Sequence, residues 1–503
     1  MNEAGATAAA PVTAPAATAV PQPTVFGQPR GLVTLFMTEM WERFTYYGMR
    51  AVLILYMVAA VSKGGMGLDD RTSSAIYGMY IGGTSLLGLL GGWIADRLIG
   101  AQRAVPVGAV LIIAGNLMLA LGSAAPFFAG LLVITVGVGL LKPNASVMVA
   151  GLYPEGGARR DAGFSFFYMG INLGAFIGPF IVGAAAELIG WRWGFVASAL
   201  GMAAGLVQYL YTRRYLGSAG GTPEADRRGS WLPVIALIAV VAVVAVLAMS
   251  GVLRLDAVWL SQAASWAMVA LGVTYFAYLL FFTRLSRAER NRVLVMIALV
   301  AAGVTFWAGY EQAGASMNLF ADRYTNRHLF GWEYSAAALQ SVNPFFIIVF
   351  APVFAALWIA LGKRGRDLNA AAKFGAGLLS LGAGFFVMYL GALHVAAGQI
   401  VLPTWLILTY LLHTFGELCL SPVGLSHMSK LAPPRFVGQV MGMWFLSMAL
   451  GSNLAGQLSG QYDASDLASL PALFLKIFWY TVIAGCVMLL LTPVARKLMA
   501  GVH

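Results

Sequence analysis

Charged residues are scarce in this chain: Lys, Arg, Asp and Glu together make up 10% of its 503 residues, whereas 60% are hydrophobic. A soluble domain carries about 25% charged residues. Cysteine is scarcer still, with only Cys419 and Cys486, both within apolar runs. No disulfide framework is therefore expected, and no cluster of His, Cys, Asp and Glu has the spacing of a zinc or haem site. The composition excludes an ordinary soluble domain and predicts a polytopic, all-α membrane protein.

Long apolar runs divide the chain into membrane spans. The run Trp231–Met249, for example, meets the requirement of about 20 apolar residues for crossing a bilayer. The pattern predicts about fourteen such helices, near 31–62, 72–97, 103–122, 126–152, 161–188, 192–214, 230–252, 257–283, 292–321, 335–361, 370–396, 402–429, 436–461 and 472–495.

The loops between the spans set the expected orientation. Twenty Lys and Arg residues fall on one side and six on the other. Basic loops stay on the cytoplasmic side, so both termini are predicted to be cytoplasmic. Residues 1–28, rich in Ala, Pro and Thr, are predicted to form a disordered tail rather than a cleaved signal. The net charge of +11 is thus explained by topology and phospholipid, and no nucleic-acid partner is expected.

The first span carries a charged stripe. Its sequence EMWERFTYYGMR lies between the apolar runs GLVTLF and AVLILYMVAAV. Each helical residue advances by about 100°, and one narrow face therefore holds Glu39, Glu42, Arg43, Tyr46 and Arg50.

Further polar residues occur inside the apolar spans of both halves. Because an ionisable group in a membrane span is costly, it usually marks a substrate or ion pathway. One reading is a central cavity lined from both halves; the other is a set of ion pairs that only fasten helices together. The residues beyond the first span are Lys142, Asn172, Glu311, Asn343, His413 and Glu417.

A second signal lies between spans two and three, in GGWIADRLIGAQR from Gly91 to Arg103. Its glycines let two helices approach each other, and Asp96, Arg97 and Arg103 stand at helix ends where charges can pair. The segment resembles the cytoplasmic loop motif of major facilitator superfamily transporters. An ordinary basic turn is the alternative.

The charged stripe itself resembles a family signature. Glu39-x-x-Glu42-Arg43-Phe44-x-Tyr46-Tyr47-Gly48 is similar to the ExxERFxYYG string of proton-dependent oligopeptide transporters, and residues 167–174 match that family's FYxxINxG block. Further blocks of the family pattern are matched along the rest of the chain, so that the resemblance covers residues 31–499. It implies two six-helix bundles, at 29–216 and 289–499, joined by a linker over 217–288 that holds two extra helices; residues 500–503 form a tail.

The resemblance also implies a site for a zwitterionic peptide. Arg43 and Lys142 would receive the carboxylate, since arginine can form two parallel hydrogen bonds to it. Glu417, with Asn172 and Asn343, would hold the amino end and the peptide bond. The aromatic walls, for which plain packing is the alternative, would be Tyr46, Tyr47, Trp307 and Trp444.

Proton coupling needs carboxylates whose proton affinity changes with conformation, as when an ion pair forms and breaks. Glu39 and Glu42, beside Arg43, are the leading candidates, with Glu311 and Lys142 also assigned to coupling. The resemblance implies two ion pairs between the bundles: Arg50 with Glu311 on the periplasmic side, and Lys142 with Glu417 nearer the site.

One position departs from the family pattern. Ser85 stands where many members have a tyrosine, and span two has no histidine, so a histidine relay there is not expected. His413 lies one helical turn before Glu417 and either modulates that carboxylate or bonds to a neighbouring helix.

The predicted function is the proton-coupled import of di- and tripeptides by alternating access in a bacterial inner membrane. No cofactor is expected, and the protein is expected to be monomeric. A proton-coupled carrier of a non-peptide solute, such as nitrate or a peptide-like drug, is the nearest alternative. A membrane enzyme is disfavoured because no nucleophile–base pair, metal cluster or nucleotide loop is present.

Overall fold

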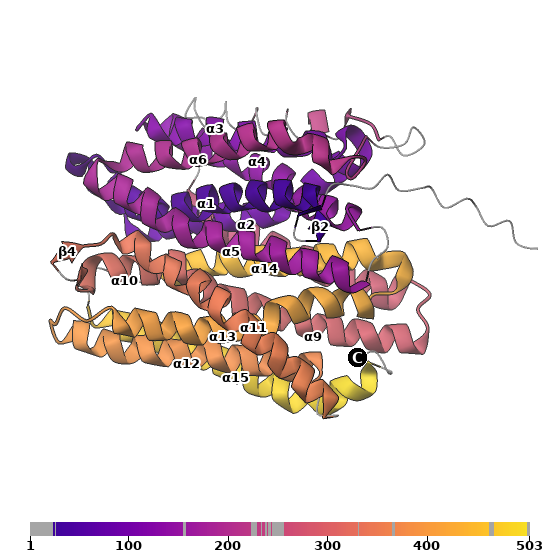
Figure 1. Ribbon diagram of the computed structural model, residues 1–503. Helices are drawn as coiled ribbons and strands as arrows, with labels where there is room; N and C mark the ends of the chain where they lie inside the picture. Colours follow the sequence, from indigo (N-terminus) through magenta and orange to yellow (C-terminus); the bar gives the residue numbers. More distant parts are fainter. Residues whose placement is uncertain are drawn as a thin grey trace, which may run out of the picture.

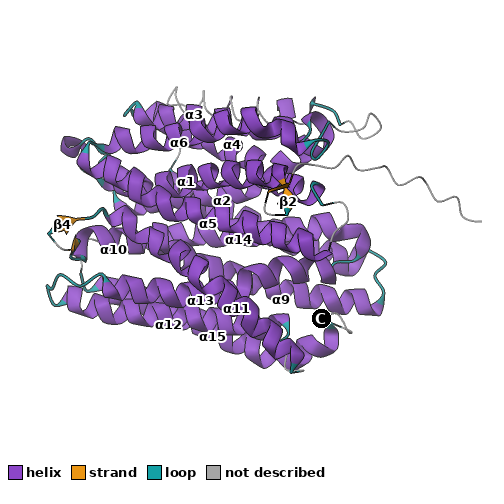
Figure 2. Cartoon of the chain, viewed as in Figure 1, coloured by secondary structure: helices purple, strands orange, loops and turns teal. Residues whose placement is uncertain are grey.

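The computed structural model describes residues 24–25, 27–153, 157–222, 229–232, 234–236, 239, 243, 256–329, 331–364, 368–461 and 467–499. These segments are almost entirely helical, with two short antiparallel strand pairs (Figure 2). The first pair joins β1 (Thr24–Val25) to β2 (Gln28–Pro29), and the second joins β3 (His328–Leu329) to β4 (Trp332–Glu333).

The N-terminal helices form one bundle. The central helix α1 packs against α5 and α6, while α3 packs against α4 and α6. Short turns link the helices, including a π-helical turn at Ala95–Ile99. The bundle consists of α1 (Arg30–Val58), α2 (Asp70–Ile94), α3 (Ala101–Ala120), α4 (Ala124–Gly151), α5 (Gly157–Leu188) and α6 (Trp191–Thr212).

The C-terminal helices form a second bundle, drawn from rose through orange to yellow below the first in Figure 1. Here α12 packs against α13 and α15, and α9 packs against α14. The bundle consists of α9 (Arg287–Tyr310), α11 (Val342–Lys363), α12 (Ala370–Ala396), α13 (Thr404–Leu431), α14 (Val437–Ser459) and α15 (Ser469–Leu498). The additional helix α8 (Ala257–Ala277) contacts both α2 and α14.

Thirteen of the fourteen expected spans are present as helices of 20 residues or more. Eleven helical segments of the described chain are long and apolar enough to cross a membrane. The remaining two long helices are α14 and α1. The middle of α1 carries charged residues. The expected span near 230–252 lies largely outside the described residues.

The predicted span 292–321 is not one continuous helix. Helix α9 ends at Tyr310, a 3₁₀ turn follows at Glu311–Gly314, and the short helix α10 occupies Ser316–Tyr324. Likewise, a 3₁₀ turn at Ala336–Ser341 precedes α11. These breaks place polar backbone and side chains between the bundles, where hydropathy alone predicted uninterrupted helix.

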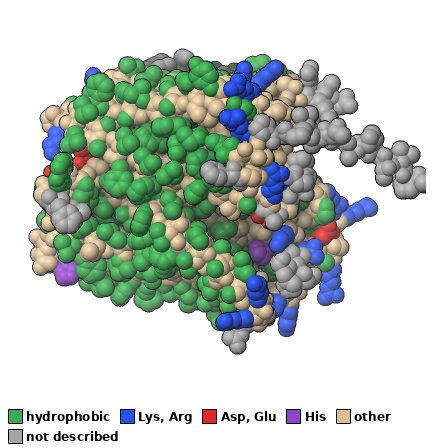
Figure 3. All heavy atoms as spheres, in the orientation of Figure 1, with side chains coloured by type: hydrophobic (Ala, Val, Ile, Leu, Met, Phe, Trp, Pro, Cys, Tyr) green, Lys and Arg blue, Asp and Glu red, His purple; other side chains and the backbone are tan. Residues whose placement is uncertain are grey.

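The molecule has two distinct ends. At one, here called the basic end, α2, α4, α6, α11, α13 and α15 finish, and Lys and Arg side chains gather there (Figure 3). Hydrophobic side chains cover most of the visible surface between the two ends, as expected where lipid is the solvent.

The bundles are joined at the opposite end. Arg323 of α10 makes two 2.7 Å hydrogen bonds to the Asp70 carboxylate of α2. Arg327 lies 2.9 Å from the Glu187 carboxylate of α5. The Asn318 amide donates to the Ala51 carbonyl oxygen of α1 at 2.8 Å. These contacts close the opposite end.

Candidate functional site

The charged stripe of α1 is buried and internally paired. Arg43 Nε lies 3.1 Å from Glu39 Oε1 and 2.5 Å from Glu42 Oε2, and none of the three side chains is more than 3% exposed. The Arg43 guanidinium also lies over the Tyr46 ring, 5.3 Å from its centroid. Two carboxylates thus share one guanidinium on a single helix face, as the sequence spacing predicted.

The same helix reaches the other bundle through Arg50. Its Nη2 atom lies 3.2 Å from Glu311 Oε2, and both side chains are at least nine-tenths buried. Glu311 begins the 3₁₀ turn that interrupts the helix after Tyr310. The predicted contact between Arg50 and Glu311 is therefore present, and it lies on the closed side of the molecule.

The Glu417 carboxylate of α13 has two hydrogen-bonding partners. Its Oε2 atom accepts a 2.7 Å bond from the Tyr310 hydroxyl and a 3.3 Å bond from the Asn343 amide. Tyr310 Oη also lies 3.0 Å from Asn343 Oδ1, so that one phenol touches both groups. A fixed network thus holds the carboxylate from α9 and α11.

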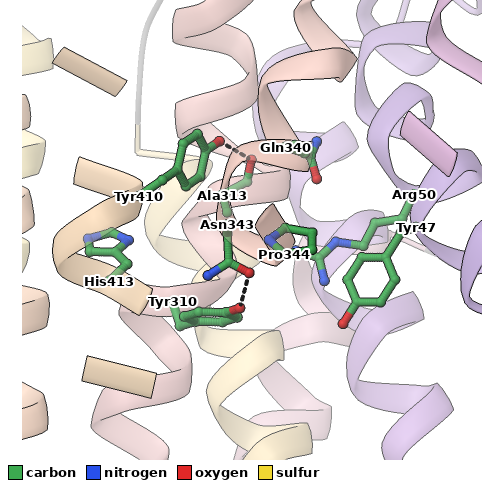
Figure 4. A pocket seen from close by; sticks show the side chains of 9 residues that line it. All are labelled: Tyr47, Arg50, Tyr310, Ala313, Gln340, Asn343, Pro344, Tyr410 and His413. Atoms are coloured by element: carbon green, nitrogen blue, oxygen red, sulfur yellow. Dashed lines mark hydrogen bonds between the residues drawn. The ribbon is translucent and has the colours of Figure 1, made fainter. Parts of the chain in front are cut away.

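A small cavity lies beside this network. Figure 4 shows Tyr310 and Asn343 on one side, with Tyr47 and Arg50 of α1 facing them. The remaining lining residues are Ala313, Gln340, Pro344, Tyr410 and His413.

Tyr310 was not among the residues selected from the sequence. Its only signal there is its position directly before Glu311, within a stretch of aromatic residues. Its importance depends on the helix break after residue 310 and on the crossing of α9 with α13, which spacing along one span does not encode.

The predicted Lys142–Glu417 ion pair is absent from this structure. No carboxylate of the described residues lies within ion-pair distance of Lys142, and Glu417 accepts hydrogen bonds from Tyr310 and Asn343 instead. Lys142 is exposed although it lies inside the span α4. The Tyr168 side chain of α5 is also 39% exposed inside its span. Because the opposite end is closed, we infer that solvent reaches these residues from the basic end.

The other predicted binding residues differ in whether they contact the network around Glu417 or other parts of the bundles. Asn172 is buried, and its amide donates to the Tyr168 carbonyl oxygen of its own helix. Trp307 is 8% exposed and packs edge-on against Tyr310. Trp444 lies inside the C-terminal bundle against Phe374. In this conformation Trp444 contributes to packing, and its role as a wall of the site stays a prediction.

His413 is buried and lines the cavity, with its ring 4.8 Å from that of Phe385 on α12. Ser85, the position where the family pattern changes, is half-buried on α2. Both ring nitrogens of His413 are buried without a hydrogen-bond partner among the described residues, so the predicted bond to a neighbouring helix is not confirmed, and modulation of Glu417 stays a prediction.

The loop motif is only partly reproduced. A Cβ atom on Gly91 would lie 2.0 Å from the Gly139 carbonyl oxygen, so glycine is required where α2 crosses α4. Asp96, Arg97 and Arg103 are exposed, and within the described part of the chain no ion pair joins them.

Two helical bundles with paired charges buried between them define a membrane transporter of the major facilitator fold rather than an enzyme. The model of the POT family (PTR2) matches residues 102–479. The chain belongs to this family.

Relatives are similar over almost their whole length. A peptide transporter of Yersinia enterocolitica is 43% identical, the match covering 95% of this chain and 96% of the relative. A di-/tripeptide transporter of Lactococcus lactis is 34% identical, with 95% and 98% covered.

Solved structures of transporters are also similar to this chain. The crystal structure of a peptide transporter, POT, in complex with sulfate is 40% identical, with a TM-score of 0.89 and with 96% of this chain and 98% of that chain covered. A POT family transporter in complex with 5-aminolevulinic acid is 36% identical, with a TM-score of 0.86 and coverage of 95% and 99%.

Proposed function

We propose that this protein is a proton-coupled symporter that imports di- and tripeptides by alternating access. The observation that carries the proposal is the placement of cationic and anionic groups on different bundles. Arg43 and Lys142 belong to the N-terminal bundle, and Glu417 to the C-terminal bundle. A zwitterion bound to both would link the bundles, as alternating access requires. The names of the relatives support peptides as its substrates.

The substrate's amino group would meet Glu417, and its carboxylate would meet Arg43 and Lys142. The Tyr310–Asn343 network supports this role for Glu417, because it fixes the carboxylate while leaving Oε1 without a bond in that network. The exposed Lys142 is accessible to a substrate carboxylate. Tyr46, Tyr47 and Trp307 would supply apolar walls that accept many side chains.

Protons would be carried by Glu39, Glu42 and Glu311. Each is buried against an arginine, so its proton affinity depends on whether that ion pair is intact. Protonation of Glu311 would weaken its attraction for Arg50 and so release the opposite end. This sequence of events links proton entry to opening on one side.

The orientation follows from the basic end. We place this end and both termini in the cytoplasm of a bacterial cell, with the protein in the inner membrane as a monomer. In this orientation the closed end would face the periplasm and the accessible end the cytoplasm.

A second candidate is the transport of a small non-peptide solute. A related POT family transporter has been solved in complex with 5-aminolevulinic acid. Such a molecule also carries an amino group and a carboxylate, so the two candidates share the same charged anchors.

Competition for uptake of a labelled dipeptide into proteoliposomes tests the charged anchors that both candidates share, and 5-aminolevulinic acid as a competitor separates the two. Unmodified dipeptide should compete better than its N-acetyl form by orders of magnitude, because acetylation leaves Glu417 desolvated without a charged partner. Free amino acids and nitrate should compete poorly.

Two variants distinguish the role of Glu417 in binding the amino group from that of its neighbour in the site, Asn172. Glu417→Gln should shrink the difference between free and acetylated peptide, whereas Asn172→Ala should weaken both alike. Equal competition by the acetylated peptide against the wild-type protein would refute the role of Glu417 as the anchor of the substrate's amino group.

A further inference from the structure

The extra helix α8 is attached to the C-terminal bundle by a buried polar cluster. Ser261 and Ser265 lie one turn apart on a helix that has no charged residues, and both are more than nine-tenths buried. Their partners on α14 are the amides of Asn453 and Gln457, also one turn apart. Two polar pairs with matching spacing thus meet across one helix crossing.

The contacts within this cluster are short. Asn453 Oδ1 accepts a 2.9 Å bond from the Ser261 hydroxyl, while Asn453 Nδ2 donates to the Ser261 carbonyl oxygen at 2.7 Å and to Ser265 Oγ at 2.9 Å. Gln457 Nε2 lies 3.0 Å from the Ser261 carbonyl oxygen and 2.9 Å from Ser265 Oγ. Both amides therefore hold the same turn of α8.

The same stretch of α14 meets α2 of the other bundle through small residues. A Cβ atom on Gly78 of α2 would lie 3.0 Å from the carbonyl oxygens of Ser452 and Asn453. Nearby, the hydroxyls of Ser74 and Ser459 are 3.1 Å apart. Because α8 contacts α2 as well as α14, it lies along the junction between the bundles.

The two junctions differ in what separation would cost. Pulling α8 from α14 would leave two amides and two serines without partners in an apolar environment, which is unfavourable. Pulling α2 from α14 breaks mainly close packing of small residues and one hydroxyl contact. When the end opposite the basic end opens, α2 should therefore separate from α14, while α8 should stay bound to α14.

We propose that Asn453 and Gln457 fix α8 to the C-terminal bundle, so that α8 moves with this bundle and covers its junction with α2 from the lipid. Asn453 and Gln457 are thus positioning residues for an element outside the substrate site. The inference rests on the proposed alternating access, since it concerns which helices move together.

Spin-label distances test this without altering the cluster. Cysteines would be introduced, in a background carrying Cys419→Ser and Cys486→Ser, at three exposed positions near the opposite end. These are Trp259 on α8, Ile400 before α13 and Leu188 at the end of α5. Distances would be compared between protein alone at neutral pH and protein with dipeptide at acid pH.

The 188–400 distance reports movement of the bundles. We expect it to change together with the 259–188 distance, while the 259–400 distance stays constant. A 259–400 distance that changes as much as the 188–400 distance would overturn the proposal. A constant 188–400 distance would instead count against alternating access.

Cross-linking gives an independent functional test in proteoliposomes. A disulfide between Ser261→Cys and Asn453→Cys should leave peptide transport at the level of the reduced variant. The matched disulfide between Ser74→Cys and Ser459→Cys, which joins α2 to α14, should abolish transport until it is reduced. Loss of transport on oxidising the first pair, regained on reduction, would show that α8 must leave α14 and would contradict the proposal.

Discussion

At the scale of single residues, the Arg50–Glu311 contact is the clearest link between the bundles. Both side chains are buried, at 4% and 6% exposure, and the two residues are 261 positions apart in the sequence. Removing one partner of a buried ion pair typically costs about 3–5 kcal/mol, because the other charge remains without compensation. The pair should therefore control the stability of the closed opposite end.

Alanine substitutions test this link. Arg50→Ala and Glu311→Ala should each lower the initial rate of dipeptide uptake by roughly tenfold or more, since each leaves a buried charge unpaired. The charge swap Arg50→Glu with Glu311→Arg should restore part of the rate. Independent, additive losses with no rescue by the swap would argue against a functional pair.

The α1 carboxylates make a different prediction, about coupling rather than gating. Glu42→Gln should abolish uphill uptake driven by a pH gradient but leave some peptide counterflow at equal pH, because substrate binding does not require this proton. Glu39→Gln serves as the parallel variant. If both variants accumulated peptide as well as the wild-type protein, the stripe would not be part of the proton path.

The residues also mark where sequence reasoning succeeded and where it did not. Periodicity within one helix correctly brought Glu39 and Glu42 to Arg43. Contacts between distant helices were predicted only from the family resemblance. Of the two pairs so implied, Arg50–Glu311 is present, whereas Glu417 is bound to Tyr310 and Asn343. The Tyr310 contact depends on a helix break that local pattern did not reveal.

At the scale of helices, hydropathy predicted the spans well because lipid demands long apolar helices. It could not reveal the 3₁₀ turns at Glu311–Gly314 and Ala336–Ser341, since polar backbone at these breaks is tolerated only when other helices cover it. Nor did it predict which helices pack face to face. The close approach of α2 to α14 depends on small residues whose positions mattered only once the helices were placed.

Gly78 provides a test of that approach. Gly78→Leu should prevent α2 from closing on α14, because even a Cβ atom would lie 3.0 Å from three atoms of α14. We expect peptide uptake to fall by roughly tenfold. We also expect a cysteine introduced at the opposite end to react faster with a water-soluble thiol reagent. The matched control is Gly88→Leu on the same helix, where a Cβ atom would meet no other atom within 4 Å. Equal losses in both variants would indicate general damage to α2 rather than a blocked closure.

At the scale of the whole molecule, the structure has one closed and one accessible end. Cross-bundle contacts from Asp70, Glu187 and Ala51 close the end opposite the basic loops. Lys142 and Tyr168 are exposed within their spans, and because the other end is closed we infer that access is from the basic end. A transporter working by alternating access must reverse this asymmetry during each cycle, with the two bundles moving as units.

The most direct test is uptake of a labelled dipeptide into proteoliposomes with an imposed pH gradient, acid outside. The account predicts that peptide accumulates above its external concentration, that a protonophore abolishes this accumulation, and that unlabelled di- and tripeptides compete for it. Peptide uptake that only equilibrates, with no response to the gradient or to the protonophore, would contradict proton-coupled transport by this protein.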